Sequence, residues 1–217
     1  MRPVKIGPLT PSDTSTVWFN PASLTSTGAA VAPLQTSTLD NLAHRITLTA
    51  PVQASLAALA FTVVGTDAAG NPQTEVIAAG PVSGATVNST KFFLSVLTIQ
   101  PSATMGTGAG AKVLAVGLLA EAIGYWVNLE NTMSAPMVMV NVTGTINYTV
   151  LQTPANIFDE VGTAYTALGI AIPNMSAVTT QVLANGGESC RAIMLRVNSF
   201  TAGATITAHI NNSGGGY

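Results

Sequence analysis

Hydrophobic and polar residues alternate along much of this chain, and the alternation predicts β-strands rather than helices. In the longest run Asn or Thr fill most of the odd-numbered positions. The apolar residues fall on the even-numbered positions: Val138, Val140, Val142, Ile146, Tyr148 and Val150. This period of two predicts a strand or a hairpin with one buried face, and Gly144 marks a bulge or bend within it. Shorter alternating or β-rich runs predict further strands at residues 45–49, 91–99, 193–197 and 206–210.

A second pattern, at residues 61–77, predicts a β-hairpin. Phe61 and Val63 alternate with polar residues, and alternation resumes at residues 74–77. The intervening segment 67–72 contains Gly70 and Asn, which favour a chain reversal, and Asp67, which we expect to bond its own backbone. Pro72 is expected to block continued pairing, because proline has no backbone N–H to donate.

Many short strands separated by Gly and Pro predict an all-β fold, with one or two antiparallel β-sandwich (jelly-roll-like) units. Residues 1–35 contain five prolines, which predicts an extended N-terminal arm with no central strand. Residues 36–120 are expected to form the first β-sandwich unit. Residues 121–217 are expected to form a second β unit with a flexible C-terminal tail. A short helix ending at Pro173 is expected within residues 158–172.

The low charge of the chain predicts an assembled protein. Only 7% of residues are charged, against roughly 25% in an ordinary globular protein. A monomer with so few charges is poorly protected against aggregation and edge pairing. We therefore expect other subunits to cover much of the surface. Val17, Trp18 and Phe19 in the arm, and Tyr217 in the tail, are the candidate subunit contacts.

Composition also excludes several classes of protein. The formal net charge is −2 and the seven Lys and Arg residues are scattered, which argues against nucleic-acid binding. Neither a signal peptide nor a membrane-spanning segment is recognisable, so no membrane partner is expected. The single cysteine, Cys190, excludes an intramolecular disulfide and a cysteine-based zinc cluster.

No motif points to catalysis. The glycine-rich segment 106–112 ends in Ala-Lys and is followed by Val, whereas a phosphate-binding loop ends in Gly-Lys-Ser/Thr. His44 and His209 lie beside predicted strands, and Cys190 is better explained as a small apolar side chain. Asp159 and Glu160 fit a helix start better than acid–base chemistry. We therefore expect no catalytic residues, no cofactor, no metal site and no enzymatic activity.

One stretch, residues 45–100, carries a resemblance. It contains FTVVGTDAAGNPQTE from Phe61, VNSTKFF from Val87, and VLTI from Val96. This resembles a pattern in virion proteins of tailed bacteriophages, in which a "TGTDADGNPVTE" hairpin precedes a "TSTKxFxxVxSI" strand. The resemblance implies a β-sandwich subunit of a capsid or tail, without catalytic residues to carry over.

These observations lead to three hypotheses of function. The first is a capsid decoration (cement) protein that bridges capsid subunits, located in the virion after assembly in the host cytoplasm. Its partners would be the major capsid protein and copies of itself, with a trimer favoured. The second is a tail, collar, head-to-tail connector or fibre-anchoring subunit, with tail or connector partners. The third is a carbohydrate-binding β-sandwich module, for which Trp18, Trp126 and Tyr125 are the only candidate stacking residues, although Tyr125-Trp126 better fits a core position.

Overall fold

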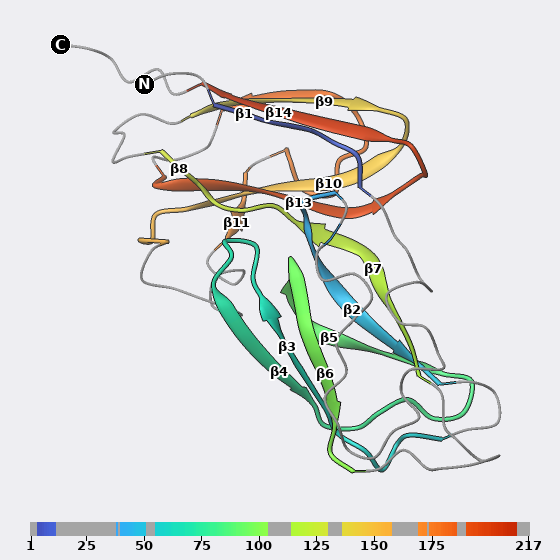
Figure 1. Ribbon diagram of the computed structural model, residues 1–217. Coiled ribbons are helices and arrows are strands. Elements are labelled where there is room, and N and C mark those ends of the chain that lie inside the picture. Colours follow the sequence, from blue (N-terminus) through green and yellow to red (C-terminus); the bar gives the residue numbers. More distant parts are fainter. Residues whose placement is uncertain are drawn as a thin grey trace. The chain divides into compact units, whose positions relative to one another are not determined.

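The computed structural model describes residues 4–11, 38, 40–50, 55–103, 114–129, 136–157, 169–172, 174–185 and 190–211. These residues form an all-β protein, and no helix occurs among them (Figure 1). The chain divides into two compact units. Unit 1 comprises residues 1–12, 40–42 and 120–217, and unit 2 comprises residues 13–39 and 43–119.

Unit 1 is a β-sandwich of two antiparallel sheets. The first is four-stranded, with the order β1 (Val4–Leu9), β14 (Thr205–Asn211), β9 (Met137–Thr143) and β12 (Val182–Asn185). The second has the order β11 (Ile170–Ala171), β10 (Ile146–Thr153), β13 (Ala192–Phe200) and the end of β7 (Ala115–Ile123), and β8 (Val127–Asn128) also pairs with β13. In Figure 1 the strands β1, β14 and β9 form one layer, and β10 and β13 form the next.

The core of unit 1 lies between these sheets and is formed by alternate residues of each strand. Its members include Val138, Val140, Tyr148, Val150, Ile193, Leu195, Ile206 and Ile210, all at most 1% exposed. Burying a side chain of this size stabilises a fold by about 1.5–3 kcal/mol relative to leaving it in water. The period-2 pattern of the sequence therefore encodes this core directly.

The longest alternating run does not form one strand or a hairpin. It forms β9 and β10, which belong to opposite sheets of the sandwich. The chain turns between them at Gly144, whose φ of +79° favours glycine. A second corner joins β13 to β14 and contains Gly203, with φ of +77°. The two corners are hydrogen-bonded, because the Thr201 amide donates to the Thr145 carbonyl at 2.9 Å.

The predicted arm is wrong for its first residues, because Val4–Leu9 form strand β1 in unit 1. This strand lies at the edge of its sheet and pairs with β14. The ladder shifts register between Ile6 and Leu9, so Pro8 occupies an irregular edge position where a missing N–H is tolerated. A Cβ on Gly7 would lie 2.6 Å from the Ile206 carbonyl oxygen, so only glycine fits there. In the rest of the predicted arm, residues 1–3 and 12–35 lie outside the described residues.

Unit 2 also consists of two facing sheets. One is three-stranded, with the order β4 (Pro72–Ile77), β3 (Phe61–Thr66) and β6 (Ser95–Pro101). The other contains the start of β7, β2 (Ala43–Thr49) and β5 (Thr86–Phe93). Both contribute to one core, whose fully buried members include Ile46, Leu48, Phe61, Val63, Phe93, Val96, Ile99 and Val116.

The hairpin predicted at residues 61–77 is confirmed as β3 and β4. The Asp67 carboxylate accepts hydrogen bonds from the Ala69 and Asn71 amides, each at 2.9 Å, as expected for a turn aspartate. Pro72 does not interrupt the ladder, since it pairs with Thr66 as the first residue of β4. A first position of this kind needs no amide donor toward the partner strand.

Two other expectations differ from the structure in the residues that it describes. The strand predicted at residues 91–99 is divided at Leu94, because β5 pairs with β2 in one sheet and β6 pairs with β3 in the other. The helix predicted within residues 158–172 is absent from its described part, where Ile170–Ala171 form strand β11. Residues 158–168 lie outside the described part of the chain.

Candidate interaction surface

The four-stranded sheet of unit 1 exposes apolar side chains on the face turned away from the core. On β9 Val138 and Val140 are buried, and Met137 and Met139 are 43% and 39% exposed. On the neighbouring strand β12, Leu183 pairs with Met139 and is 63% exposed. We call these three residues the Met–Leu patch. They come from adjacent strands with matched register, so they lie side by side on the sheet surface.

The Met–Leu patch lies at one end of a row that crosses the whole sheet. Lys5 on β1 pairs with His209 on β14, His209 pairs with Met139, and Met139 pairs with Leu183. The row is therefore cationic at the β1 edge and apolar at the β12 edge. Neighbouring positions on β9 and β14 carry Asn141, Thr143, Thr205 and Thr207, so Lys5 is the charged residue of this face within the described strands.

The three-stranded sheet of unit 2 has an outward face of similar chemistry. Val76 on β4 is 59% exposed and pairs with Thr62, and Leu97 on β6 is 51% exposed. Other outward positions on these strands are also uncharged, among them Val64, Thr74, Thr98 and Gln100. Both units thus present sheet faces that depend on Thr, Asn and aliphatic residues rather than on charge.

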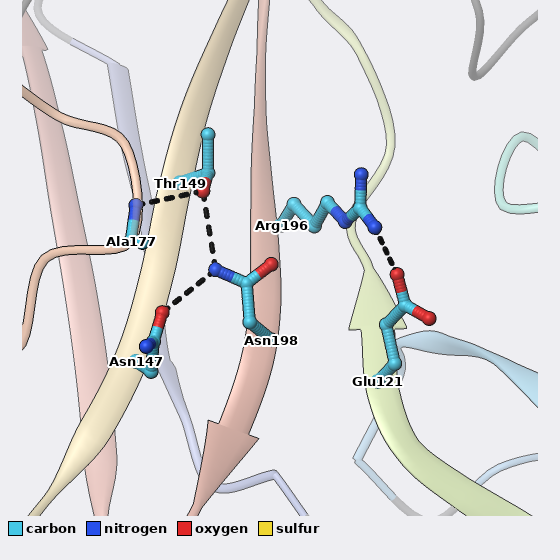
Figure 2. Close-up of polar contacts among 6 residues, drawn as sticks. All are labelled: Glu121, Asn147, Thr149, Ala177, Arg196 and Asn198. Carbon is cyan, nitrogen blue, oxygen red and sulfur yellow. Dashed lines mark hydrogen bonds and ion pairs between the residues drawn. The ribbon is translucent and has the colours of Figure 1, made fainter.

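The second sheet of unit 1 carries a polar network instead (Figure 2). The Asn198 side-chain amide donates to Asn147 Oδ1 at 2.8 Å and to Thr149 Oγ1 at 3.1 Å. The Ala177 amide also donates to Thr149 Oγ1, at 3.1 Å. These contacts tie β10 and β13 to the segment around Ala177, so the asparagines have structural partners within the unit.

An ion pair lies next to this network. Figure 2 shows Arg196 on β13 pointing toward Glu121 on β7, and their side chains form a hydrogen-bonded ion pair. Arg196 and Ile123 are paired residues of the same two strands. The ion pair therefore holds the end of β7 against β13. It also gives two of the few charged side chains of the chain a partner of opposite charge.

Polar side chains of β4 and β5 tie the two sheets of unit 2 together. The Glu75 carboxylate of β4 accepts hydrogen bonds from the Thr90 and Lys91 amides of β5, at 2.6 and 2.9 Å. In return, Lys91 Nζ donates to the Thr74 carbonyl at 2.7 Å. Gln73 donates to the Phe92 carbonyl in the same way. We call this set of contacts the β4–β5 seam, and it closes one side of the sandwich with side chains.

The nucleophile and base candidates are also accounted for by packing. Cys190 lies in the core of unit 1, as a small apolar side chain would, and burial raises the pKa of its thiol from 9.0 to about 11. A reactive cysteine needs the opposite shift, since the thiolate is the nucleophile. His44 in unit 2 is fully buried, and its Nδ1 donates to the Leu119 carbonyl at 2.8 Å because a carbonyl oxygen only accepts.

Tyr148 is the largest fully buried side chain among the described residues of unit 1. Its hydroxyl donates to the Thr180 carbonyl at 2.9 Å. Burial raises the pKa of this phenol from 10.0 to about 12. The hydroxyl therefore serves to anchor the segment that precedes β12.

The four contact residues predicted from the sequence, Val17, Trp18, Phe19 and Tyr217, lie outside the described residues.

The Met–Leu patch was not predicted. Its signal was present in the sequence, because residues 137–140 are apolar on both phases of the alternation and not only on the buried one. A strand that is apolar on both faces is typical of one that is covered on both faces.

Candidates for other functions are limited within the described residues. Trp126 is 4% exposed and belongs to the core, whereas its neighbour Tyr125 is 51% exposed. No group of three or more His, Cys, Asp or Glu residues suited to a metal ion occurs in this part of the chain. Nor do the described residues include a helix long and apolar enough to cross a membrane.

Comparison with known proteins adds no relative. No family model matches the chain, and no curated protein matches it.

Proposed function

We propose that this chain is a non-enzymatic structural subunit of a tailed-bacteriophage particle, and that it acts as a capsid decoration (cement) protein bridging capsid subunits. In this role it is assembled in the host cytoplasm and located in the virion. Its partners are the major capsid protein and other copies of the chain. The mechanism is burial of uncharged sheet surface between subunits, with no chemical step.

The observation that carries the proposal is the Met–Leu patch. Met137, Met139 and Leu183 are exposed on a sheet face whose charged residue is Lys5, at the far edge. Exposed contiguous apolar surface marks interaction sites in soluble proteins. The patch supplies the apolar centre and the surrounding Asn and Thr supply a polar rim, which is the usual anatomy of a protein interface.

The resemblance in unit 2 supports a virion role for a different reason. Its polar residues form the β4–β5 seam and the Asp67 turn, so they serve the fold. A pattern of this kind would be kept wherever this sandwich is used. The resemblance therefore supports the fold of unit 2 and the class of protein. The proposed contact surface rests instead on the exposed residues of unit 1.

The alternative is a tail, collar or head-to-tail connector or fibre-anchoring subunit. The same patch would serve there, and the identity of the neighbouring subunit separates the two roles. The carbohydrate-binding hypothesis is weakened, because Trp126 is buried in the core and cannot stack on a sugar ring. Among the described candidates only Tyr125 is exposed, and it does not by itself form the row of aromatic residues that such a site needs; Trp18 lies outside the described residues.

The test is binding of purified protein to expanded empty phage heads, measured by co-sedimentation and by cryo-electron microscopy of the decorated particle. We expect saturable binding with density over capsid subunits. The variant Met139→Lys should weaken binding at least tenfold, because it places a charge at the centre of the patch. The control Val82→Lys changes an equally apolar residue that is 54% exposed in a turn of unit 2, and it should bind as the wild type does.

Density at the tail or connector would favour the alternative role. Failure to bind any part of the particle would contradict the proposal.

A further inference from the structure

Strand β12 is an edge strand that lacks the protection found on β1, β4 and β6, and its four residues make it longer than the two-residue edge strand β11. β1 carries Lys5, Pro8 and a register shift. The free edge of β4 is engaged by the β4–β5 seam. β6 ends on Pro101, and its ladder to β3 contains a register shift. Charges, prolines and bulges are the usual means by which proteins prevent unwanted pairing of an edge.

β12 has the sequence Val-Leu-Ala-Asn, with neither charge nor proline. It pairs with β9 through all four residues without a register shift, and no described strand pairs with its other side. Leu183, on this strand, is 63% exposed. A regular, uncharged edge with an exposed leucine is suited to accept another strand.

We propose that two copies of this chain pair through β12, antiparallel and across a twofold axis, so that the two four-stranded sheets become one continuous sheet. This inference rests on the proposed function, since it names one contact between like copies within the assembly. We assign a second copy as the partner because a strand without charge can pair with its own copy across a twofold axis, where residues face residues of the same strand, without opposing like charges. β12 brings no charge to such a contact, whereas β1 paired with itself would bring Lys5 toward Lys5.

The row that crosses the sheet favours the same arrangement. Its apolar end, Met139 and Leu183, lies at β12, and its cationic end, Lys5, lies three strands away, at about 14 Å for ordinary strand spacing. Pairing at β12 therefore joins two apolar ends into one strip and keeps the two Lys5 side chains at opposite outer edges. The joined strip doubles the apolar surface that is available to the shell.

The first test is sedimentation velocity over a hundredfold range of concentration. We expect the wild type and Val82→Lys to form a reversible dimer. Leu183→Lys should raise the dimer dissociation constant at least tenfold, because it places two ammonium groups at the join. Circular dichroism establishes that each variant is folded. A wild type that stays monomeric, a trimer, or unchanged dimerisation of Leu183→Lys would overturn the inference.

The second test locates the contact. The native Cys190 is buried, so the variant Leu183→Cys adds an exposed thiol that can form a disulfide between two copies. Mild oxidation should link Leu183→Cys into dimers, and Val82→Cys should remain unlinked. Amide hydrogen exchange at residues 182–185 should slow at least threefold above the dissociation constant. If amide exchange at residues 182–185 were as fast in the dimer as in the monomer, the contact would lie elsewhere and the inference would be overturned.

The two proposals fail separately. If the wild type binds phage heads but never pairs through β12, the pairing is wrong and the virion role stands. If the dimer forms through β12 but no part of the phage particle is bound, the pairing stands and the virion role is wrong.

Discussion

The two units close their sandwiches in different ways, although both are built from two facing sheets. Unit 2 uses side chains to seal the gap between β4 and β5, with Glu75, Lys91 and Gln73 bonding the backbone of the opposite strand. Unit 1 leaves β12 with an uncharged edge and an exposed leucine beside two exposed methionines. Unit 2 thus engages its β4 edge with its own side chains, and unit 1 presents the apolar surface at which we propose a partner.

The difference also shows how a protein with very few charges distributes them. Charged residues of unit 2 such as Glu75 and Lys91 are used for internal closure. In unit 1, Glu121 and Arg196 pair with each other on the second sheet. Within the described strands, the four-stranded sheet of unit 1 has Lys5 as its charged residue, at the edge farthest from the Met–Leu patch. The face at which we propose contact between subunits therefore carries little charge, as does the outward face of the three-stranded sheet of unit 2.

The largest expected effect concerns the bend from β5 to β6 in unit 2. A Cβ on Gly65 would lie 1.9 Å from the Ser95 carbonyl oxygen, so Gly65→Ala must displace the backbone at this bend. We expect a loss of about 3 kcal/mol in the free energy of unfolding, measured by chemical denaturation. The control is Gly124→Ala in unit 1, where the Cβ would make an ordinary contact at 3.6 Å. A loss below 1 kcal/mol for Gly65→Ala would contradict the close packing of unit 2.

The next effect concerns the core of unit 1 at alkaline pH. The Cys190 pKa is raised from 9.0 to about 11, so between these values the folded state keeps a proton that the unfolded state loses. The stabilisation is complete below pH 9 and is lost as the pH rises through 11. It amounts to about 2–3 kcal/mol.

Denaturation curves from pH 8 to 11 should show this loss in the wild type. The slope should be shallower in Cys190→Ala, and the part that remains reflects Tyr148, whose pKa is about 12. An unchanged slope in Cys190→Ala would show that the thiol is not buried in this core.

A smaller effect is expected at the β4–β5 seam. Glu75→Ala removes the acceptor of the Thr90 and Lys91 amides. These groups are partly exposed, so water replaces some of the lost bonding, and we expect a loss of about 1–2 kcal/mol. Glu75→Gln keeps one acceptor oxygen and should lose less. Equal losses for the two variants, measured by chemical denaturation, would show that the hydrogen bonds do not stabilise the seam.

The smallest effect on folding is expected at the Met–Leu patch. Leu183→Lys alters a residue that is 63% exposed, so the free energy of unfolding of the isolated chain should change by no more than about 0.5 kcal/mol. Its effect should instead appear in assembly. A large loss of stability in the monomer would show that Leu183 packs within unit 1 and is not a contact residue.

The sequence predicts the strands better than their arrangement. The hairpin at residues 61–77 was predicted because Asp67 and Gly70 specify a local turn. The alternation from Val138 to Val150 predicted the buried residues, but it could not show that β9 and β10 lie in opposite sheets. An inward-facing residue remains inward on either side of a sandwich, so the pattern is the same in both arrangements.

The errors have similar local causes. The prolines at residues 3 and 8 suggested an arm, but an edge strand with a register shift tolerates Pro8. The interaction surface was missed because Met137 and Met139 fall on the odd phase that was assigned to solvent. Leu183 lies in a four-residue strand, too short for an alternation pattern to be recognised.

Methionine oxidation gives the most direct measurement of the central claim that the Met–Leu patch is covered in the assembled particle. Met137 and Met139 are exposed in the chain alone, and Met175 and Met194 are fully buried in the same unit and serve as internal controls. Dilute peroxide followed by mass spectrometry should oxidise Met137 and Met139 readily in the isolated protein and at least tenfold more slowly in the particle, while Met175 and Met194 react slowly in both. Equal oxidation of Met137 and Met139 in the two states would contradict the account.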